Sequence, residues 1–365
     1  MAQLSASLRA HVDKYFLRSS HILAAEGFDP VVTMQVFFRD GPGTFAGIDE
    51  AVALFREGSS LAEHGGSLHA LPEGAAFSPL EPVMHIEGHL ADFIELETLY
   101  LGIVSAATSL ANGLSEPAPD AVEAKAAAIR ALLPGKQLMY FGARHWHPRC
   151  EEAFCRAAVA AGFDACATDA GARAAGLPGG VGTIPHALVL AFASKVGREH
   201  ATREATLAFD RHTEASCPRV ALVDTFNREI DDALDTARAL GDTLAAVRLD
   251  TAGESIGQGG TPFDGRQYWT GTGVTVAGTL AMRQALDTAG FTDVGIVLSS
   301  GFGNLEKVKA FAAAEAQYGR LFESVGIGGL FTSFAATADI VRVNGRDLAK
   351  TGRAYHPNAR LVRLI

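Results

Sequence analysis

The stretch that decides the fold is VALVDTFNREIDDALDTARALGDTLAAVRLDTAG, residues 220–253. It opens on a short apolar run, Val220–Val223, and closes near another, Ala246–Leu249; runs of this kind are typical of buried strands. Between them, Asn227–Leu240 carries its apolar residues at helical spacing. A strand, a helix and a second strand in this order indicate a parallel βαβ unit.

The same alternation continues on both sides of this unit. Further strands are expected at Gln137–Phe141, Gly295–Leu298 and Gly326–Leu330. Further helices are expected at Cys150–Ala161, Thr275–Ala289 and Leu305–Tyr318. Five or more such units in series favour a barrel over a small open sheet. The predicted fold class is therefore α/β, with an irregular or partial (β/α) barrel over residues 116–337.

The first 115 residues follow a different pattern, which predicts a smaller N-terminal α+β domain. Helices are expected at Leu4–Glu26, Ile48–Leu61 and Ala91–Ala111, and strands at Val31–Arg39, Ser67–Leu71 and Val83–Glu87. The turn-rich residues 114–119 predict a surface connection to the barrel. The C-terminal segment, residues 338–365, is available to complete this domain.

The composition is that of a globular protein with a core. Of 365 residues, 48% are hydrophobic and 20% charged, which excludes disorder as the main state. The formal charge of -10 disfavours nucleic acid and anionic membranes as partners. Four irregularly spaced cysteines, the lack of a signal-peptide pattern and the short apolar runs together predict a cytoplasmic protein with free thiols.

Three sequence patterns resemble a nucleophile elbow, a P-loop and a zinc site, but each is incomplete. Ser255 lies in a G-x-S-x-G sequence, but a loop composition follows it where a nucleophile elbow needs a helix. Lys350 precedes a threonine as in a P-loop, yet Ala349 stands where that motif has glycine. Cys150 and Cys155 follow two histidines but lie about 140° apart on the expected helix, so they cannot share a zinc ion.

The ends of the predicted strands carry polar residues that should meet at one rim, because active sites of such folds lie at the carboxyl ends of the strands. Asp224 and Asp250 each follow an apolar run, and Arg248 shares a strand face with Asp250. A carboxylate beside a core needs a cation or a hydroxyl as partner. The alternative for Asp224 is a helix N-cap, since aspartate is a favoured cap.

Glycines gather at the last two strand ends. They lie in SSGFGN and SVGIGG, and a helix is expected to start directly after the first of these sequences. Glycines let backbone N–H groups approach an anion, and a helix N-terminus adds dipole attraction. A phosphate site is therefore expected here, with ordinary tight turns as the alternative.

Several segments, taken in order, resemble the nicotinate phosphoribosyltransferase family, of the nicotinate/quinolinate type with an α/β barrel. They are LPEGAAFSPLEPVMHIEG, ELETLYLGIVSAATSLA, YFGARHWHP, GTIPHAL, ALVDTF and VRLDTAG, followed by LSSGF and VGIGG. The resemblance covers residues 13–353, nearly the whole chain.

The resemblance implies an activity and its requirements. Members of this family join nicotinate to phosphoribosyl pyrophosphate, which gives nicotinate mononucleotide and pyrophosphate in NAD salvage. It implies Mg²⁺, possible coupling to ATP, and a homodimer or larger homo-oligomer with shared active sites.

The resemblance also assigns residues to the pyridine. Phe141 would stack on the ring, and Arg144 and Arg248 would pair with ligand anions; a planar guanidinium matches a carboxylate in two-point fashion. Tyr15 would reach the pyridine from a neighbouring subunit. His145 stands where the family often has a second arginine, which weakens the expected recognition of the acid.

The remaining residues are assigned to ribose, phosphates, metal and ATP. His186, in the GTIPHAL segment with Thr183, corresponds to the histidine that ATP phosphorylates in ATP-coupled members. Asp224 and Asp250 would contact ribose hydroxyls and magnesium. The phosphate contacts would come from Ser300, Gly301, Gly303, Gly326, Gly328 and Gly329.

Two other functions stay open at this point. A quinolinate phosphoribosyltransferase would need several clustered cations for a second carboxylate, and few lie near the motifs. A non-catalytic paralogue that binds the ligand would be expected to have lost Asp224, Asp250 or the glycines, which are all present.

Overall fold

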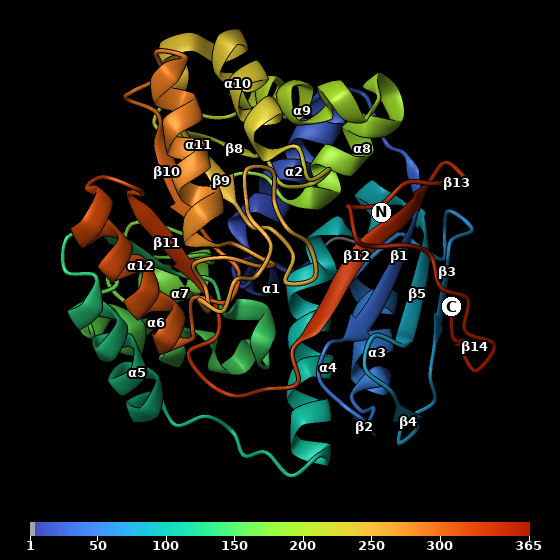
Figure 1. The fold of residues 1–365 in the computed structure, drawn as a ribbon. Coiled ribbons are helices and arrows are strands. Elements are labelled where there is room, and N and C mark those ends of the chain that lie inside the picture. Colours follow the sequence, from blue (N-terminus) through green and yellow to red (C-terminus); the bar gives the residue numbers. More distant parts are fainter. Residues whose placement is uncertain (1–3) are drawn as a thin grey trace.

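A six-stranded parallel sheet forms one half of the computed structural model, which describes residues 4–365 (Figure 1). The strand order is β7-β6-β11-β10-β9-β8, and β7 and β8 are its two edges. The strands are β6 (Gln137–Tyr140), β7 (Ala165–Cys166), β8 (Arg219–Leu222), β9 (Leu244–Leu249), β10 (Gly295–Leu298) and β11 (Ser324–Ile327). The predicted partial barrel is thus confirmed.

Helices connect these strands as predicted. They include α6 (Glu151–Ala160), α10 (Glu229–Leu240), α11 (Val276–Thr288) and α12 (Leu305–Tyr318). In α10, Ala233, Ala237 and Leu240 are buried on one face, and Glu229 and Asp231 lie in the first turn, where the helix dipole favours negative charge. Periodicity and charge placement therefore agree in specifying this helix.

An antiparallel sheet forms the other half, in the order β13-β12-β1-β5-β3-β14. Its strands are β1 (Val31–Phe38), β3 (Ser67–Ala70), β5 (Pro82–His89), β12 (Ala336–Val343), β13 (Arg346–Asp347) and β14 (Val362–Arg363). A two-stranded sheet of β2 (Gly43–Thr44) and β4 (Ala76–Phe77) lies beside it. Because Val32 pairs with Val343 and Phe38 with Ala336, the C-terminal segment belongs to the sheet that the N-terminal segment begins. The exact domain boundaries stay a prediction.

The single helix predicted over Leu4–Glu26 is wrong. The structure has a short α1 (Ala6–Arg9) and a separate α2 (Lys14–Ala25). The break lies at Asp13, whose N–H donates to the Thr98 hydroxyl at 3.0 Å. The next N–H, of Lys14, donates to the Ala167 carbonyl at 2.8 Å. These tertiary hydrogen bonds replace helical ones and attach the start of α2 to the parallel half.

A core helix, α4 (Glu97–Ala111), runs between the two halves (Figure 1). Two 3-10 turns, Leu90–Asp92 and Ile94–Leu96, precede it in place of the helical start expected at Ala91. Within the described residues, Ile94–Ala111 is the one helical stretch that is long and apolar enough to cross a membrane. This stretch is longer than the short apolar runs of the sequence suggested. Of its residues, 78% are buried inside the protein, as expected of a core helix.

Some elements were not predicted. They include α5 (Pro119–Leu132), α7 (Asp169–Ala174), α8 (His186–Val196) and α9 (Arg198–His212), while the expected α3 is present at Ile48–Gly58. The helices α8 and α9 pack against each other, and α9 also packs against α2 (Figure 1). This packing places the N-terminus of α8 beside the ends of the parallel strands.

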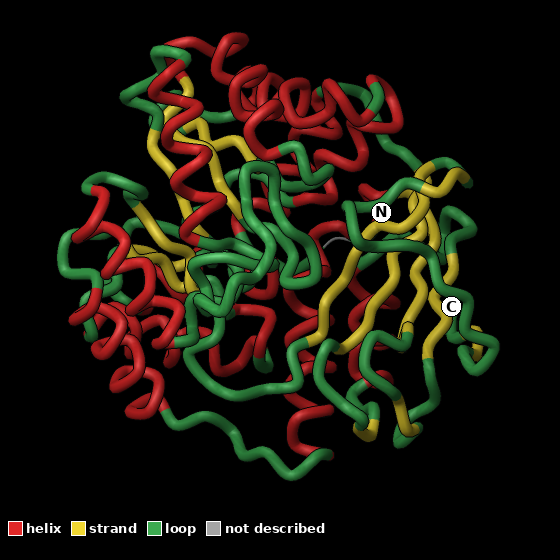
Figure 2. Tube along the Cα trace, in the orientation of Figure 1, coloured by secondary structure: helices red, strands yellow, loops and turns green. Residues whose placement is uncertain are grey.

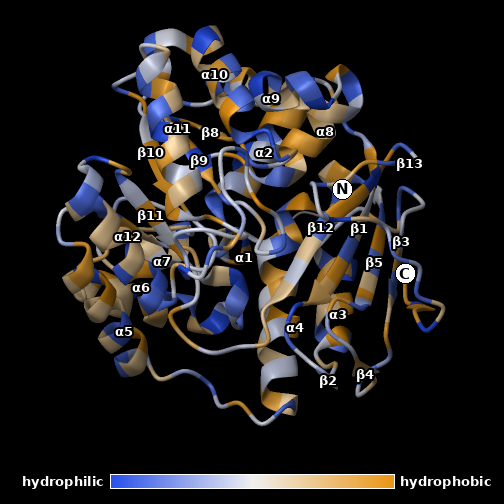
Figure 3. Ribbon diagram, in the orientation of Figure 1, coloured by the Kyte–Doolittle hydropathy of each residue, from blue (hydrophilic) through white to orange (hydrophobic). Residues whose placement is uncertain are grey.

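Two buried apolar clusters support the two halves. One lies under the antiparallel sheet and includes α4 and α8, and the other lies between the parallel strands and their helices (Figure 3). Loops that follow the parallel strands turn toward the antiparallel sheet (Figure 2). The candidate site lies where these loops, α4 and the antiparallel sheet meet.

Candidate active site

A cavity of about 700 Å³ opens at the carboxyl ends of the parallel strands. Its lining includes most of the predicted site residues: Tyr15, Phe141, Arg144, His186, Arg248, Asp250, Ser300, Gly301, Gly303, Gly326, Gly328 and Gly329. Asp224 and Thr183 are not part of the lining. The fold therefore brings together residues that lie more than 300 positions apart.

Tyr15 and Arg144 meet at one end of the cavity. The Tyr15 hydroxyl accepts a hydrogen bond from the Arg144 guanidinium of the same chain. The hydrogen bonds of Asp13 and Lys14 explain this contact within one chain, because they direct α2 into its own cavity. The expectation that Tyr15 reaches the pyridine of a neighbouring subunit stays a prediction.

Two buried acids that were not predicted as site residues lie close to Tyr15 and Arg144. Asp13 and Glu97 line the cavity and are 2% and 6% exposed. Burial raises the pKa of Glu97 to about 8 against the opposing charge of Arg144, and burial likewise raises the pKa of Asp13. The available signal for Glu97 was a glutamate at the start of an otherwise apolar helix.

Glycines make room for the rings at the same end. A Cβ on Gly326 would lie 2.3 Å from Phe141 Cε2, and a Cβ on Gly328 would lie 2.6 Å from His145 Cε1. Burial, assisted by the charge of Arg144, lowers the pKa of His145 to about 4. His145 is thus neutral at neutral pH, and Arg144 and Arg248 supply the positive charge.

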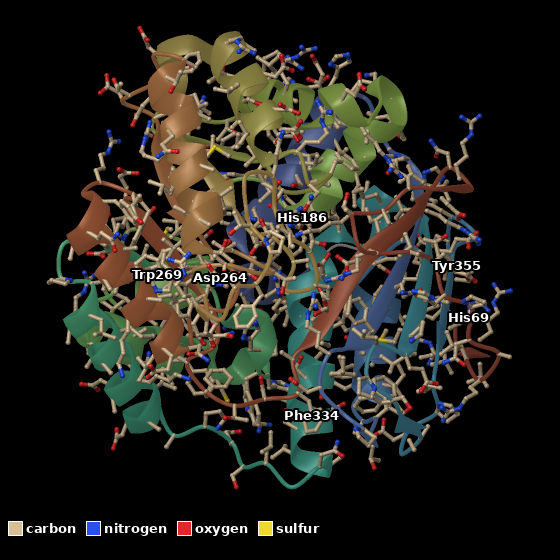
Figure 4. All side chains as sticks on the ribbon, in the orientation of Figure 1. His69, His186, Asp264, Trp269, Phe334 and Tyr355 are labelled. Carbon is tan, nitrogen blue, oxygen red and sulfur yellow. The ribbon has the colours of Figure 1, made fainter. Side chains whose placement is uncertain are left out.

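His186 lies at the centre of the molecule, as the first residue of α8 (Figure 4). Its Nδ1 atom is 3.0 Å from the Thr225 hydroxyl. Its Nε2 atom is 3.5 Å from Asp224 Oδ2 and 3.6 Å from Asp250 Oδ2. The structure thus groups the three residues that were selected from separate motifs.

Lys350 joins this group, although in the sequence it stands only in an incomplete P-loop pattern. Its Nζ atom lies 2.5 Å from Asp224 Oδ2, 2.9 Å from His186 Nε2 and 3.0 Å from the Asp250 carbonyl oxygen. No local signal marks this lysine, because its partners lie at least 100 residues away in the chain.

The two aspartates differ in surroundings. The Asp224 side chain has no exposed surface, and the N-cap of α10 is Arg228, so the alternative N-cap role is wrong. The Asp250 side chain is 26% exposed and accepts from the Ser299 hydroxyl at 2.9 Å. Burial alone would raise the pKa of Asp250, but the neighbouring His186, Arg248 and Lys350 outweigh it and hold the pKa below its usual range. Asp250 therefore presents fixed negative charge to the cavity.

The glycine loops form the third part of the site. Ser300 and Gly301 both have left-handed backbone, with φ of 69° and 78°, which is uncommon for serine. A Cβ on Gly303 would lie 2.1 Å from the Gly329 carbonyl oxygen, so the two loops touch through their backbones. The Asn304 side chain caps α12 by accepting from the N–H groups of Glu306 and Lys307, so these two groups are not available to an anion.

Comparison with known proteins relates this site to a family. Residues 13–108 match the family described as quinolinate phosphoribosyl transferase, N-terminal domain. The chain is 31% identical over 281 residues to nicotinate phosphoribosyltransferase pncB1 of Mycobacterium tuberculosis. The aligned part is 76% of this chain and 52% of the relative. It is 25% identical over 327 residues to nicotinate phosphoribosyltransferase of Bacillus subtilis, covering 80% and 58%.

The chain belongs to the nicotinate and quinolinate phosphoribosyltransferase family. It spans about half the length of the curated relatives that it matches. The fold is that of the family: a putative nicotinate phosphoribosyltransferase of Saccharomyces cerevisiae has a TM-score of 0.70 at 17% identity, covering 94% of this chain and 92% of that chain. The corresponding protein of Porphyromonas gingivalis has a TM-score of 0.65 at 13% identity, with the same coverage.

Of the two aspartates predicted to bind a metal, only Asp250 has a partly exposed side chain in the cavity. Residues 4–365 contain no group of three or more metal-binding side chains close enough to hold an ion together. Asp224 Oδ2 contacts Lys350, and Asp224 Oδ1 is buried without a hydrogen-bond partner among residues 4–365. Asp224 does not fit a hydrated magnesium ion, whereas the partly exposed Asp250 does.

Proposed function

We propose that this protein transfers the phosphoribosyl group of phosphoribosyl pyrophosphate to nicotinate, producing nicotinate mononucleotide and pyrophosphate for NAD salvage. The observation that carries the proposal is a single cavity that brings Arg144 and Arg248 together with Asp250 and His186, Arg248 lying 4.0 Å from the Asp250 carboxylate. An aromatic acid suits the two arginines, and a ribose beside it suits Asp250.

The residues suit the chemistry of this transfer. The pyridine nitrogen attacks the anomeric carbon as pyrophosphate leaves, and the transition state resembles an oxocarbenium ion. Fixed negative charge close to that carbon stabilises it, and the lowered pKa of Asp250 keeps that charge in place. Nicotinate needs no deprotonation at nitrogen, which agrees with a site whose role is positioning.

Magnesium is proposed to enter with the pyrophosphate of the substrate. Mg²⁺ usually binds through one or two carboxylates together with substrate phosphates and water. Asp250 is the carboxylate that can meet such an ion, and the loops of Ser300–Gly303 and Gly326–Gly329 are the proposed phosphate contacts. Thr183 lies outside the cavity lining, and its contact with substrate is likewise proposed.

Nicotinate is favoured over quinolinate by the charge of the pyridine end. Glu97, with its pKa raised to about 8, is largely neutral at pH 7, so only Asp13 offsets part of the positive charge of Arg144 and Arg248. That balance suits one carboxylate better than two. The proposed setting is the cytoplasm, with small-molecule substrates and a homodimer or larger homo-oligomer, and without nucleic acid or membrane as partner.

The test compares nicotinate, nicotinamide and quinolinate, each with phosphoribosyl pyrophosphate and Mg²⁺. Nicotinate should give the highest kcat/KM. Asp250→Asn should lower kcat about a hundredfold while the fold is kept. The matched control is Asp242→Asn, an exposed residue of the turn after α10, which should leave kcat unchanged. Transfer to quinolinate alone, or to no pyridine, would refute the proposal.

ATP coupling through His186 is proposed as part of the same function. If it operates, γ-labelled ATP should give the protein an acid-labile phosphate, and His186→Asn should abolish that label. The variant should retain some transfer without ATP, since the histidine is not the nucleophile toward ribose. A label that persists in the variant would place the phosphate on another residue.

A further inference from the structure

The Lys350 side chain lies in the middle of the site but is not free to bind an anion. It is 8% exposed, and its Nζ atom contacts Asp224 Oδ2, His186 Nε2 and the Asp250 carbonyl oxygen. An ammonium group has three N–H donors and no acceptor. The three partners therefore use all three donors, and none remains for a substrate phosphate.

These contacts also determine which nitrogen of His186 carries the proton. Because Lys350 can only donate, the Nε2 atom 2.9 Å away must accept, so it holds a lone pair. The proton of the neutral ring is then on Nδ1, which donates to the Thr225 hydroxyl at 3.0 Å. Without Lys350, the carboxylates of Asp224 and Asp250, 3.5 and 3.6 Å from Nε2, would favour a proton on Nε2 instead.

We propose that Lys350 is a positioning residue of the site, which neutralises Asp224 and holds His186 as the Nδ1–H tautomer with its Nε2 lone pair available. This lysine acts through Asp224 and His186 and does not contact phosphate. It also replaces a metal ion as the counter-charge of Asp224.

The position of Lys350 links the two halves of the molecule. It lies in the chain between β13 and β14, two strands of the antiparallel sheet, while its partners Asp224 and Asp250 follow strands of the parallel sheet. The neighbouring Thr351 N–H donates to the Thr225 carbonyl at 2.9 Å, and Arg353 pairs with Asp339 at 2.8 Å. The segment is thus attached on both sides of the cavity, so His186 takes its tautomer only when the halves are assembled.

The first experiment measures the His186 tautomer by ¹⁵N NMR of the full chain without substrate. The two nitrogens of a neutral imidazole have distinct ¹⁵N shifts, and His186→Gln identifies the signals among the 12 histidines. Spectra are recorded about two pH units above the ordinary histidine pKa, where an exposed ring is neutral. The parent protein should carry the proton on Nδ1, and Lys350→Met should move it to Nε2.

The matched control for this measurement is Lys309→Met. Lys309 lies on the exposed face of α12, where its side chain is 55% exposed, so the same substitution should leave the His186 signals unchanged. A parent protein already protonated on Nε2, or a tautomer that does not change in Lys350→Met, would overturn the proposal.

Kinetics separate positioning from phosphate binding, and this part alone rests on the proposed function. Arginine keeps the positive charge and binds phosphate at least as well as lysine. Its donors lie in one plane, however, so they cannot reproduce the three contacts that the Lys350 Nζ atom makes. Lys350→Met and Lys350→Arg should both lower kcat about tenfold or more, with a smaller change in KM for phosphoribosyl pyrophosphate. An increase in that KM in Lys350→Met that Lys350→Arg reverses would show a phosphate contact instead.

A double variant guards against a protein that fails to fold. Lys350→Met leaves Asp224 buried without its cation, which should lower the melting temperature. Lys350→Met with Asp224→Asn removes both charges and should regain melting temperature without regaining kcat. Recovery of kcat together with stability would assign Lys350 a structural role only. If no variant of the protein transfers phosphoribosyl groups, the proposed function fails while the tautomer result stands.

Discussion

At the scale of single residues, burial sets the charge of Glu97. The side chain lines the pyridine end of the cavity, and its pKa is raised from 4.5 to about 8, mainly by burial. It is therefore largely neutral at pH 7, and the two arginines then dominate the local charge. As the pH rises past 8, Glu97 ionises and opposes an anionic substrate.

The pH dependence of Glu97 is testable through KM and stability. KM for nicotinate should rise as pH increases through about 8, and Glu97→Gln should remove this rise. Between pH 4.5 and 8 the folded state holds a proton that the unfolded state has lost, so the free energy of unfolding falls as pH increases.

The expected stability change for Glu97 is a loss of up to a few kcal/mol over that window. Glu97→Gln should flatten the curve of unfolding free energy against pH, measured by urea unfolding. Burial also raises the pKa of Glu151, to about 7, so Glu151 lowers the unfolding free energy with increasing pH in both proteins. The difference between the two curves therefore gives the contribution of Glu97. Parallel curves would mean that Glu97 is ionised in the folded state.

Phe141 is the second residue with a direct test. Gly326 leaves the space that its ring fills at the cavity wall. Phe141→Ala should raise KM for nicotinate, because ring stacking contributes on the order of 1 kcal/mol beyond area burial. Phe263→Ala, at a side chain 60% exposed, is the matched control and should not change KM. Equal KM values in the parent and a folded Phe141→Ala protein would remove the stacking role.

At the scale of elements, two glycine loops act as one unit. Gly303, after β10, and Gly329, after β11, approach so closely that a Cβ on Gly303 would overlap the Gly329 carbonyl. Backbone contact of this kind holds the two loops at a defined separation. The glycines therefore serve loop packing in addition to any contact with phosphate.

Gly303→Ala tests this contact between loops. The added methyl group has no space, so the variant should lose about 1–3 kcal/mol of unfolding free energy, as overpacking does. KM for phosphoribosyl pyrophosphate should rise because the loops must separate. Gly135→Ala, where no atom lies within 4 Å of the new Cβ, is the control and should change neither quantity. A Gly303→Ala protein of parental stability would contradict the close contact.

At the scale of the whole molecule, a single chain lines the cavity. Tyr15 contacts Arg144 of its own chain, and Asp250 lines the same cavity. A dimer that exchanges Tyr15 between subunits is therefore not needed to complete the site. This organisation and the sharing of Tyr15 expected from the family predict opposite results for mixtures of inactive chains.

Tyr15→Ala and Asp250→Asn, unfolded and refolded together, should not recover activity if each chain completes its own site. Every cavity in the mixture then lacks one of the two residues, whatever the oligomeric state. A mixed oligomer confirmed by differential tags and mass measurement is the necessary control. Recovery of about a quarter or more of parental activity in such an oligomer would show that subunits share their sites.

The sequence by itself determined the strands β6, β8, β9, β10 and β11 of the parallel half, the helices α6, α10, α11 and α12, and the residues at the strand ends, but it did not predict β7 or the helices α5, α7, α8 and α9. Asp224, Asp250 and Phe141 could be selected because parallel strands present their carboxyl ends at one edge, whatever the loop details. Periodicity is a local property, and α10 and α12 follow it closely. The motifs of the family resemblance added His186 and Arg144.

Only the tertiary structure decided the break at Asp13, the neutral state expected of Glu97 and the place of Lys350. Each depends on groups far away in the chain: Thr98 for Asp13, the residues that bury Glu97 at the start of α4, and Asp224 and His186 for Lys350. Local spacing carries no information on which distant donor meets which acceptor, or on how much water reaches a carboxylate. Those quantities exist only once the two sheets have packed around one cavity.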